Sequence, residues 1–166
     1  MKIDISDIKR GNVKSKSFHI SQAFLLLSDI EYSDIQIGGE VIDNHTALEV
    51  TGEIAVAAKY VCGRCLEPFT VSIHLSFHES FRELGSVSGV DDAERFSYQG
   101  DSIDVSGLVQ TELVLNEPIT RICSSECRGL CPVCGVNLNQ QTCECKTDSV
   151  NPQFAALQQL LDKKKS

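Results

Sequence analysis

The 166-residue sequence lacks any long hydrophobic run, and no segment approaches the roughly 18 consecutive apolar residues that a membrane-spanning helix requires. It also lacks the apolar segment of a secretory signal peptide, because the acidic residues Asp4 and Asp7 stand close to the first residue. We therefore expect a cytoplasmic protein without membrane contact. Disulfides are rare in that reducing compartment, so the eight cysteines require another explanation. Metal binding is the usual one.

Catalytic motifs are lacking as well. The sequence has no glycine-rich phosphate-binding loop and no serine nucleophile motif. Among its histidines, His45 lies in a predicted turn, and His74 and His78 lie on the polar side of a predicted strand. The acidic pair Asp91 and Asp92 fits a solvated loop better than an acid–base pair. We therefore expect no enzymatic activity and no small-molecule substrate.

Negative charge dominates the middle of the chain. Residues 29–112 carry a net charge of −12, whereas residues 1–28 carry +3 and residues 113–166 carry +1. An acidic region repels the phosphate backbone of nucleic acids, because affinity for that backbone depends on neutralising phosphates. A basic partner protein fits it better. The simpler interpretation, which charge alone favours, is that the acidic residues keep a small domain soluble.

Alternating apolar and polar residues predict an antiparallel sheet. Residues 48–60 and 70–78 each alternate with a period of two, which is typical of half-buried strands. The short connection between them predicts antiparallel neighbours. Residues 35–42 predict a further strand with a bulge at Gly38 and Gly39. Residues 1–34 fit no single period, and a mixture of strand and short helix is the expectation there.

Two helices complete the predicted fold. Asp104 can cap a helix near residues 105–115, which Pro118 would terminate. The C-terminal segment, residues 148–166, predicts an amphipathic helix that Asn151 caps, and we expect it to pack on the body. The predicted fold class is therefore α+β: an antiparallel sheet of about five or six strands with two helices and a zinc-bound, cysteine-rich C-terminal segment.

A Cys-x-x-Cys motif, Cys62 and Cys65, falls on the turn between the two alternating strands. In a zinc knuckle this spacing lets both thiolates face one ion, and Gly63 eases the tight backbone path. A thiol–disulfide redox protein that uses this pair is the alternative. Redox dithiols of that kind start a helix in a β-α-β unit, whereas strands flank the motif here and Pro68 opposes a helix. The context therefore favours zinc.

Six further cysteines lie within 23 residues: Cys123, Cys127, Cys131, Cys134, Cys143 and Cys145. The segment from Cys131 to Cys134 is typical of a zinc knuckle, and the last two cysteines can complete a tetrahedral site with it. The first two would then share a second site with Cys62 and Cys65, although Cys127 could exchange roles with Cys131. We expect two zinc ions per chain, with iron–sulfur clusters as the alternative. Four thiolates leave no open coordination position, so both sites are structural.

Four segments carry a resemblance to a known family: Cys-Gly-Arg-Cys-Leu-Glu-Pro-Phe at 62–69, Ile-Asp-Val at 103–105, Cys-Arg-Gly-Leu-Cys-Pro-Val-Cys-Gly-Val-Asn-Leu-Asn at 127–139 and Asn-Pro-Gln-Phe-Ala-Ala-Leu at 151–157. In this order they resemble the YceD family of large ribosomal RNA subunit accumulation proteins. The resemblance implies a non-catalytic, bacterial factor in 23S rRNA accumulation and large ribosomal subunit biogenesis. Other members of this family lack the second cysteine cluster, so the resemblance implies that this cluster is an additional stabilising element.

The resemblance also implies partners. We expect a large-subunit ribosomal protein or a pre-ribosomal particle, with 23S rRNA as a further candidate. Contacts would concentrate at the basic residues near the cysteines: Arg64, Arg121, Arg128 and Lys146. The acidic sheet would then face a basic ribosomal protein. Ordinary surface ion pairs are the alternative role of these residues, and a zinc-ribbon module that binds nucleic acid is the alternative function.

The predicted organisation has three parts. Residues 1–120 form a β-rich body that carries the hairpin knuckle and the first helix. Residues 121–147 form the cysteine-rich zinc-binding segment. Residues 148–166 form the C-terminal helix.

Overall fold

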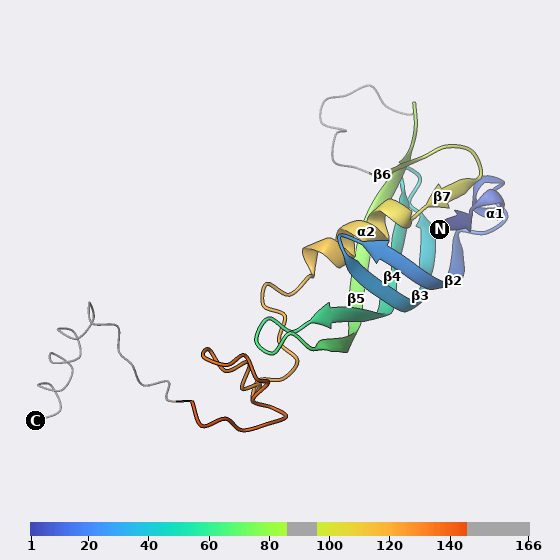
Figure 1. The fold of residues 1–166 in the computed structure, drawn as a ribbon. Coiled ribbons are helices and arrows are strands. Elements are labelled where there is room, and N and C mark those ends of the chain that lie inside the picture. Colours follow the sequence, from blue (N-terminus) through green and yellow to red (C-terminus); the bar gives the residue numbers. More distant parts are fainter. Residues whose placement is uncertain (86–95, 146–166) are drawn as a thin grey trace, which may run out of the picture. The chain divides into compact units, whose positions relative to one another are not determined.

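The computed structural model describes residues 1–85 and 96–145 (Figure 1). The chain forms two compact units. Of the described residues, the first unit comprises those within Met1–Val61 and Pro68–Arg121, and the second comprises Cys62–Glu67 and residues 122–145. The predicted helix in residues 148–166 lies outside the described residues.

The first unit is built on a five-stranded sheet in the order β2-β3-β4-β5-β6. Its strands are β2 (Ser15–Leu27), β3 (Ile30–Asp43), β4 (Leu48–Val61), β5 (Pro68–Glu83) and β6 (Phe96–Tyr98). The two alternating segments of the sequence are β4 and β5, and they pair antiparallel as predicted. The prediction of a wholly antiparallel sheet is wrong, because β6 pairs parallel to β5. Residues 84–95 connect the two strands, and a parallel pair needs a long connection of this kind.

A smaller two-stranded sheet pairs the start of the chain with a segment a hundred residues later. It consists of β1 (Lys2–Asp4) and β7 (Ser102–Asp104), which run antiparallel with Ile3 opposite Ile103. Each strand leads into a helix: β1 into α1 (Ser6–Lys9) and β7 into α2 (Ser106–Leu115). The N-terminal segment thus contains both a strand and a short helix, as expected. The helix predicted near residues 105–115 is α2.

Glycines allow β3 and β4 to approach each other closely. The predicted bulge at Gly38 and Gly39 is wrong in position, because the register shifts between Ser33 and Gln36 instead. Gly39 is needed for another reason. A Cβ atom built there would lie 2.1 Å from the carbonyl oxygen of Thr51, which no real side chain tolerates. Gly39 therefore allows the two central strands to lie this close together.

The hydrophobic core of the first unit lies between the strands and α2. Ile37 of β3, Ile54 of β4 and Leu108 of α2 are completely buried members of one cluster. The period-two alternation places such residues on a single side of each strand. In the described ranges no helix has the length and apolar character needed to cross a membrane.

Candidate metal centre

The first Cys-x-x-Cys forms a tight knuckle between β4 and β5. The amide of Cys62 donates to the carbonyl of Glu67 (2.9 Å), and the amide of Leu66 donates back to the carbonyl of Cys62 (2.9 Å). The residue that takes the left-handed backbone conformation is Leu66, with φ of 60°. That conformation costs a residue other than glycine about 1–2 kcal/mol. The knuckle therefore carries strain that a bound metal ion would offset.

A second knuckle with the same hydrogen bonds begins at Cys131. Its amide donates to the carbonyl of Val136 (2.8 Å), and the amide of Gly135 donates to the carbonyl of Cys131 (2.9 Å). The offsets of five and four residues match those of the first knuckle. Gly135, with φ of 74°, occupies the place that Leu66 holds in the first. Both pairs of cysteines thus sit on one repeated backbone geometry.

The sulfur atoms of the first quartet lie close enough together to surround one metal ion. Its members are Cys62, Cys65, Cys123 and Cys127, and their sulfurs all lie within 4.8 Å of one another. The distance from Cys62 to Cys127 is 3.8 Å, and that from Cys65 to Cys123 is 3.7 Å. These distances join different pairs of the four sulfurs, and a tetrahedron with metal–sulfur bonds of about 2.3 Å has edges of about 3.8 Å. A disulfide requires about 2.05 Å.

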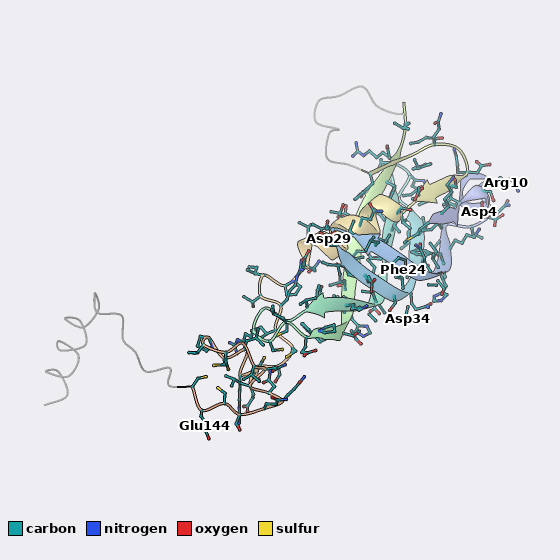
Figure 2. All side chains as sticks on the ribbon, in the orientation of Figure 1. Asp4, Arg10, Phe24, Asp29, Asp34 and Glu144 are labelled. Atoms are coloured by element: carbon teal, nitrogen blue, oxygen red, sulfur yellow. The ribbon has the colours of Figure 1, made fainter. Side chains whose placement is uncertain are left out.

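The second quartet gathers the remaining four cysteines: Cys131, Cys134, Cys143 and Cys145. Their sulfurs also lie within 4.8 Å of one another. Glu144, labelled in Figure 2, separates the last two cysteines in the chain. The structure thus forms the same two groups of four that spacing predicted. Each group could hold one metal ion, and a tetrahedral set of thiolates fits zinc or a single iron.

Each quartet contains a cysteine whose pKa is lowered, which favours the thiolate form. Backbone amides donate to the sulfur of Cys62, first that of Cys123 at 3.4 Å, and they lower the pKa of Cys62 to about 6. The amide of Cys134 likewise lowers the pKa of Cys131 to about 6. In contrast, hydrogen bonding to Cys134 raises the pKa of Cys145 to about 12. A full set of four thiolates therefore needs a cation to compensate their charge.

Asparagines from the loop of the second quartet reach the first quartet. The side-chain amide of Asn139 donates to the sulfur of Cys127 (3.3 Å), and this bond lowers the pKa of Cys127. The amide of Arg128 donates to the side-chain oxygen of Asn139 (2.8 Å), which fixes its orientation. Asn137 accepts a hydrogen bond from the backbone of Asn139 (3.0 Å) and donates to Glu67 (3.4 Å). Outer residues of this kind orient metal ligands.

Gly129 lets the two loops of the first quartet touch. It has φ of 74°, and a Cβ atom there would lie 3.0 Å from the carbonyl oxygen of Arg64. The next residue, Leu130, donates its amide to that same carbonyl (3.0 Å). The Arg64 guanidinium donates to the carbonyl of Cys127 (3.1 Å). Arg64 therefore braces the cysteine loops against each other.

The four basic residues predicted to bind a partner do not share one role. The guanidinium of Arg64 already donates to the carbonyl of Cys127, as described above. Arg121 belongs to the first unit, where it pairs with Glu117 and lies over the ring of Tyr60 at 5.3 Å. Arg128 is exposed, and its side chain forms no ion pair with a described residue. Lys146 lies outside the described residues. Partner binding by these residues stays a prediction.

The asparagines were missed by reasoning from the sequence. Zinc-ligand spacing points only to cysteines and histidines, so residues that orient the ligands escape it. One signal was available: two short amides, Asn137 and Asn139, follow directly after the second knuckle. Such side chains commonly hydrogen-bond to nearby backbone.

A family model and one curated relative carry the same family name. A family model described as "Large ribosomal RNA subunit accumulation protein YceD" matches residues 50–161. An Arabidopsis thaliana relative, "Large ribosomal RNA subunit accumulation protein YCED homolog 1, chloroplastic", is 26% identical over 151 residues, with 74% of this chain and 47% of the relative covered. An uncharacterised protein of Mycobacterium tuberculosis is 27% identical over 114 residues, covering 68% of this chain and 55% of the relative. The chain thus spans about half the length of these relatives. No solved structure matches it.

Proposed function

Because the chain belongs to the YceD family, we propose that it is a non-catalytic factor in 23S rRNA accumulation and large ribosomal subunit biogenesis. The observation that carries this proposal is the extent of the family match, residues 50–161, which includes both cysteine quartets. The factor acts by binding a large-subunit ribosomal protein, a pre-ribosomal particle or 23S rRNA itself.

The structure supports a binding role through the chemistry of its cysteines. Two sets of four sulfurs can each surround one zinc ion, and such closed sites stabilise folds without activating water. We propose zinc as the ion in both. The loops that carry the ligands then form a small rigid unit with exposed side chains, among them Arg128 and Val133. A rigid unit of this kind suits recognition more than catalysis.

The experiment that tests the function is depletion of the protein in its host, with rescue by plasmid-borne variants. We expect a fall in the ratio of 23S to 16S rRNA and a loss of large-subunit particles in a sucrose gradient. The wild-type chain should restore both, and it should sediment with large-subunit precursors. An unchanged rRNA ratio together with sedimentation only at the top of the gradient would contradict the proposal.

Two variants test whether the function depends on the first cysteine quartet. Cys62→Ser removes a ligand of the first quartet and should fail to rescue. Lys59→Met, on the exposed side of β4, removes a positive charge without touching either quartet and serves as the control. Rescue by Cys62→Ser to the wild-type level would separate the function from the first quartet.

A further inference from the structure

The edge strand β2 is open along its free side. In the part of the chain that the structure describes, β2 pairs with β3 alone. None of its 13 residues is buried. Residues 18–27 contain no proline, aspartate, glutamate, lysine or arginine. Proteins usually protect an edge of this length with charges, proline or a covering element. The unprotected stretch of β2 therefore marks a place where another strand can add.

The β2–β3 hairpin shows which residues offer their backbone. Its turn consists of Ser28 and Asp29, with φ of 48° and 68°, and Leu27 pairs with Ile30 across it. In such a two-residue hairpin the closing pair exchanges both hydrogen bonds, and the bonded pairs then alternate with non-bonded ones. Leu26 and Phe24, one and three positions before Leu27, therefore point their N–H and C=O groups toward the free edge. The carbonyl of Phe24 accepts a hydrogen bond from the side chain of Gln22 (2.8 Å), which an added strand would replace.

The side chains of the same two residues lie in solvent. Phe24 is 52% exposed and Leu26 is 60% exposed, whereas the intervening Leu25 packs against the core. Residues two apart on a strand share a face, so Phe24 and Leu26 form one apolar surface on the outer side of the sheet. An added strand would find backbone partners and apolar contacts at the same positions.

The charges around this surface are acidic. Asp29 and Asp34 are exposed and form no ion pair with described residues, and Figure 2 labels both with Phe24 on the hairpin. The neighbouring Glu31 is neutralised by Lys59 at 2.8 Å. Two unpaired carboxylates thus flank an apolar strand edge. Opposite charges favour and orient binding, whereas like charges disfavour it.

We propose that the free edge of β2 at Phe24 and Leu26 binds an extended, basic segment of a partner protein. The segment adds a strand beside β2, and its lysines or arginines pair with Asp29 and Asp34. Strand addition draws affinity from main-chain hydrogen bonds and specificity from alternate side chains. This inference deepens the proposed function, on which it rests only for the identity of the partner as a large-subunit component.

The first experiment tests the edge itself with a defined probe. The probe is a synthetic peptide of alternating valine and lysine, about ten residues long, with a valine–glutamate peptide as its acidic control. Hydrogen–deuterium exchange is followed in the full chain. The basic peptide should slow exchange at residues 23–27, and the acidic peptide should not. Equal exchange at these residues with and without the basic peptide would overturn the proposal.

Variants identify the residues responsible. Phe24→Lys with Leu26→Lys should weaken peptide binding about tenfold or more, because apolar contact is lost and like charges meet. Leu26→Pro should act in the same way, because it removes an amide that makes no bond to β3 and edge strands tolerate proline. Leu115→Lys, which changes an apolar residue of α2 that is 73% exposed, is the matched control. Equal binding by all variants would refute the proposal.

The second experiment uses purified large-subunit precursor particles. A photo-crosslinking residue at position 24 should attach the chain to a lysine- or arginine-rich segment of a ribosomal protein. A crosslink to rRNA, or to a second copy of this chain, would contradict the proposed occupant. Absence of cosedimentation by the wild-type chain would count against the proposed function alone, since the peptide experiment decides on the edge independently.

Discussion

Asp4 and Asp104 occupy equivalent places in two strand–helix units that pair with each other. The carboxylate of Asp4 accepts the amide of Ser6 (3.0 Å), and that of Asp104 accepts the amide of Ser106 (2.9 Å). Each aspartate ends a strand of the small sheet and precedes a helix. The sequences around them, Ile-Asp-Ile-Ser and Ile-Asp-Val-Ser, are nearly the same. The small sheet is therefore a local two-fold repeat.

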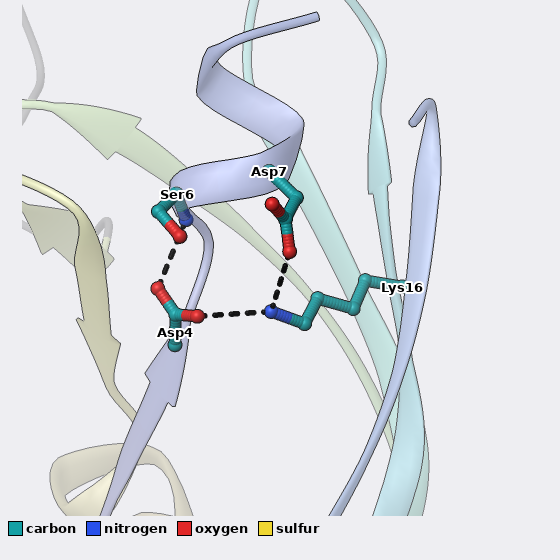
Figure 3. Close-up of polar contacts among 4 residues, drawn as sticks. All are labelled: Asp4, Ser6, Asp7 and Lys16. Atoms are coloured by element: carbon teal, nitrogen blue, oxygen red, sulfur yellow. Dashed lines mark hydrogen bonds and ion pairs between the residues drawn. The ribbon is translucent and has the colours of Figure 1, made fainter. Parts of the chain in front are cut away.

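The same hydrogen bonds make this repeat sensitive to acid. The amide of Ser6, helped by Lys16 at 3.0 Å (Figure 3), lowers the pKa of Asp4 to about 2. Ser106 lowers the pKa of Asp104 to about 2. A carboxyl group with a depressed folded-state pKa stabilises the protein above its unfolded pKa of about 3.9. That stability disappears as the pH falls toward 2.

We therefore expect stability to decline between about pH 4 and pH 2 partly through these two groups. Asp4→Asn and Asp104→Asn should each flatten the decline and lower stability at neutral pH. Urea unfolding across this pH range measures the effect. Asp101→Asn, which changes an exposed aspartate near β7 and leaves both Asp4 and Asp104 in place, is the control for the loss of a surface carboxylate. An identical decline in wild type and both variants would contradict the assignment.

Gly39 and Gly38 provide a matched pair for testing the close approach of β3 and β4. A Cβ atom at Gly39 would collide with the backbone of Thr51, whereas one at Gly38 would have its nearest contact at 3.7 Å from the His19 ring. Gly39→Ala should therefore lower the free energy of unfolding by about 3 kcal/mol or more, and Gly38→Ala by less than about 1 kcal/mol. Chemical denaturation measures both. Equal losses would refute this account of Gly39.

The two quartets should be separable by single substitutions. Cys131→Ser removes one ligand of the second quartet and leaves all four sulfurs of the first in place. We expect the bound zinc to fall from two ions to one per chain. Ser125→Ala, in the same unit, should keep both ions. Loss of both ions from Cys131→Ser would show that neither site forms alone.

Asn139 should control how tightly the first quartet holds its metal. Asn139→Ala removes the donor to the sulfur of Cys127, and loss of such outer contacts weakens metal affinity about 10–100-fold. Competition with a chromophoric chelator should release one of two zinc ions faster from this variant. Gln141→Ala changes an exposed side chain of the same loop and should release zinc at the wild-type rate. The same rate for both variants would remove Asn139 from the metal site.

Strong local patterns were readable in the sequence. The alternation from Leu48 to Tyr60 predicted β4, because one buried side dictates a period of two. The cysteine spacings predicted both quartets, because the knuckle geometry repeats at Cys62 and Cys131.

Features that depend on contacts between residues far apart in the chain could not be predicted from the sequence. The strands β6 and β7 have three residues each, too few for a period, and they exist because β5 and β1 supply partners. The bulge near Asp34, a residue with φ of 52°, contains no glycine, so the sequence gives no local sign of it. Asn139 acts on Cys127 only because the folded loop brings the two together.

The metal content of the protein tests the central claim most directly. Protein purified without chelator or added zinc is analysed by elemental mass spectrometry, with reactive thiols counted in the same sample. We predict two zinc ions per chain and no reactive thiol until a chelator is added. A chain that carries no zinc and eight freely reactive thiols would contradict the assignment of both quartets as structural zinc sites.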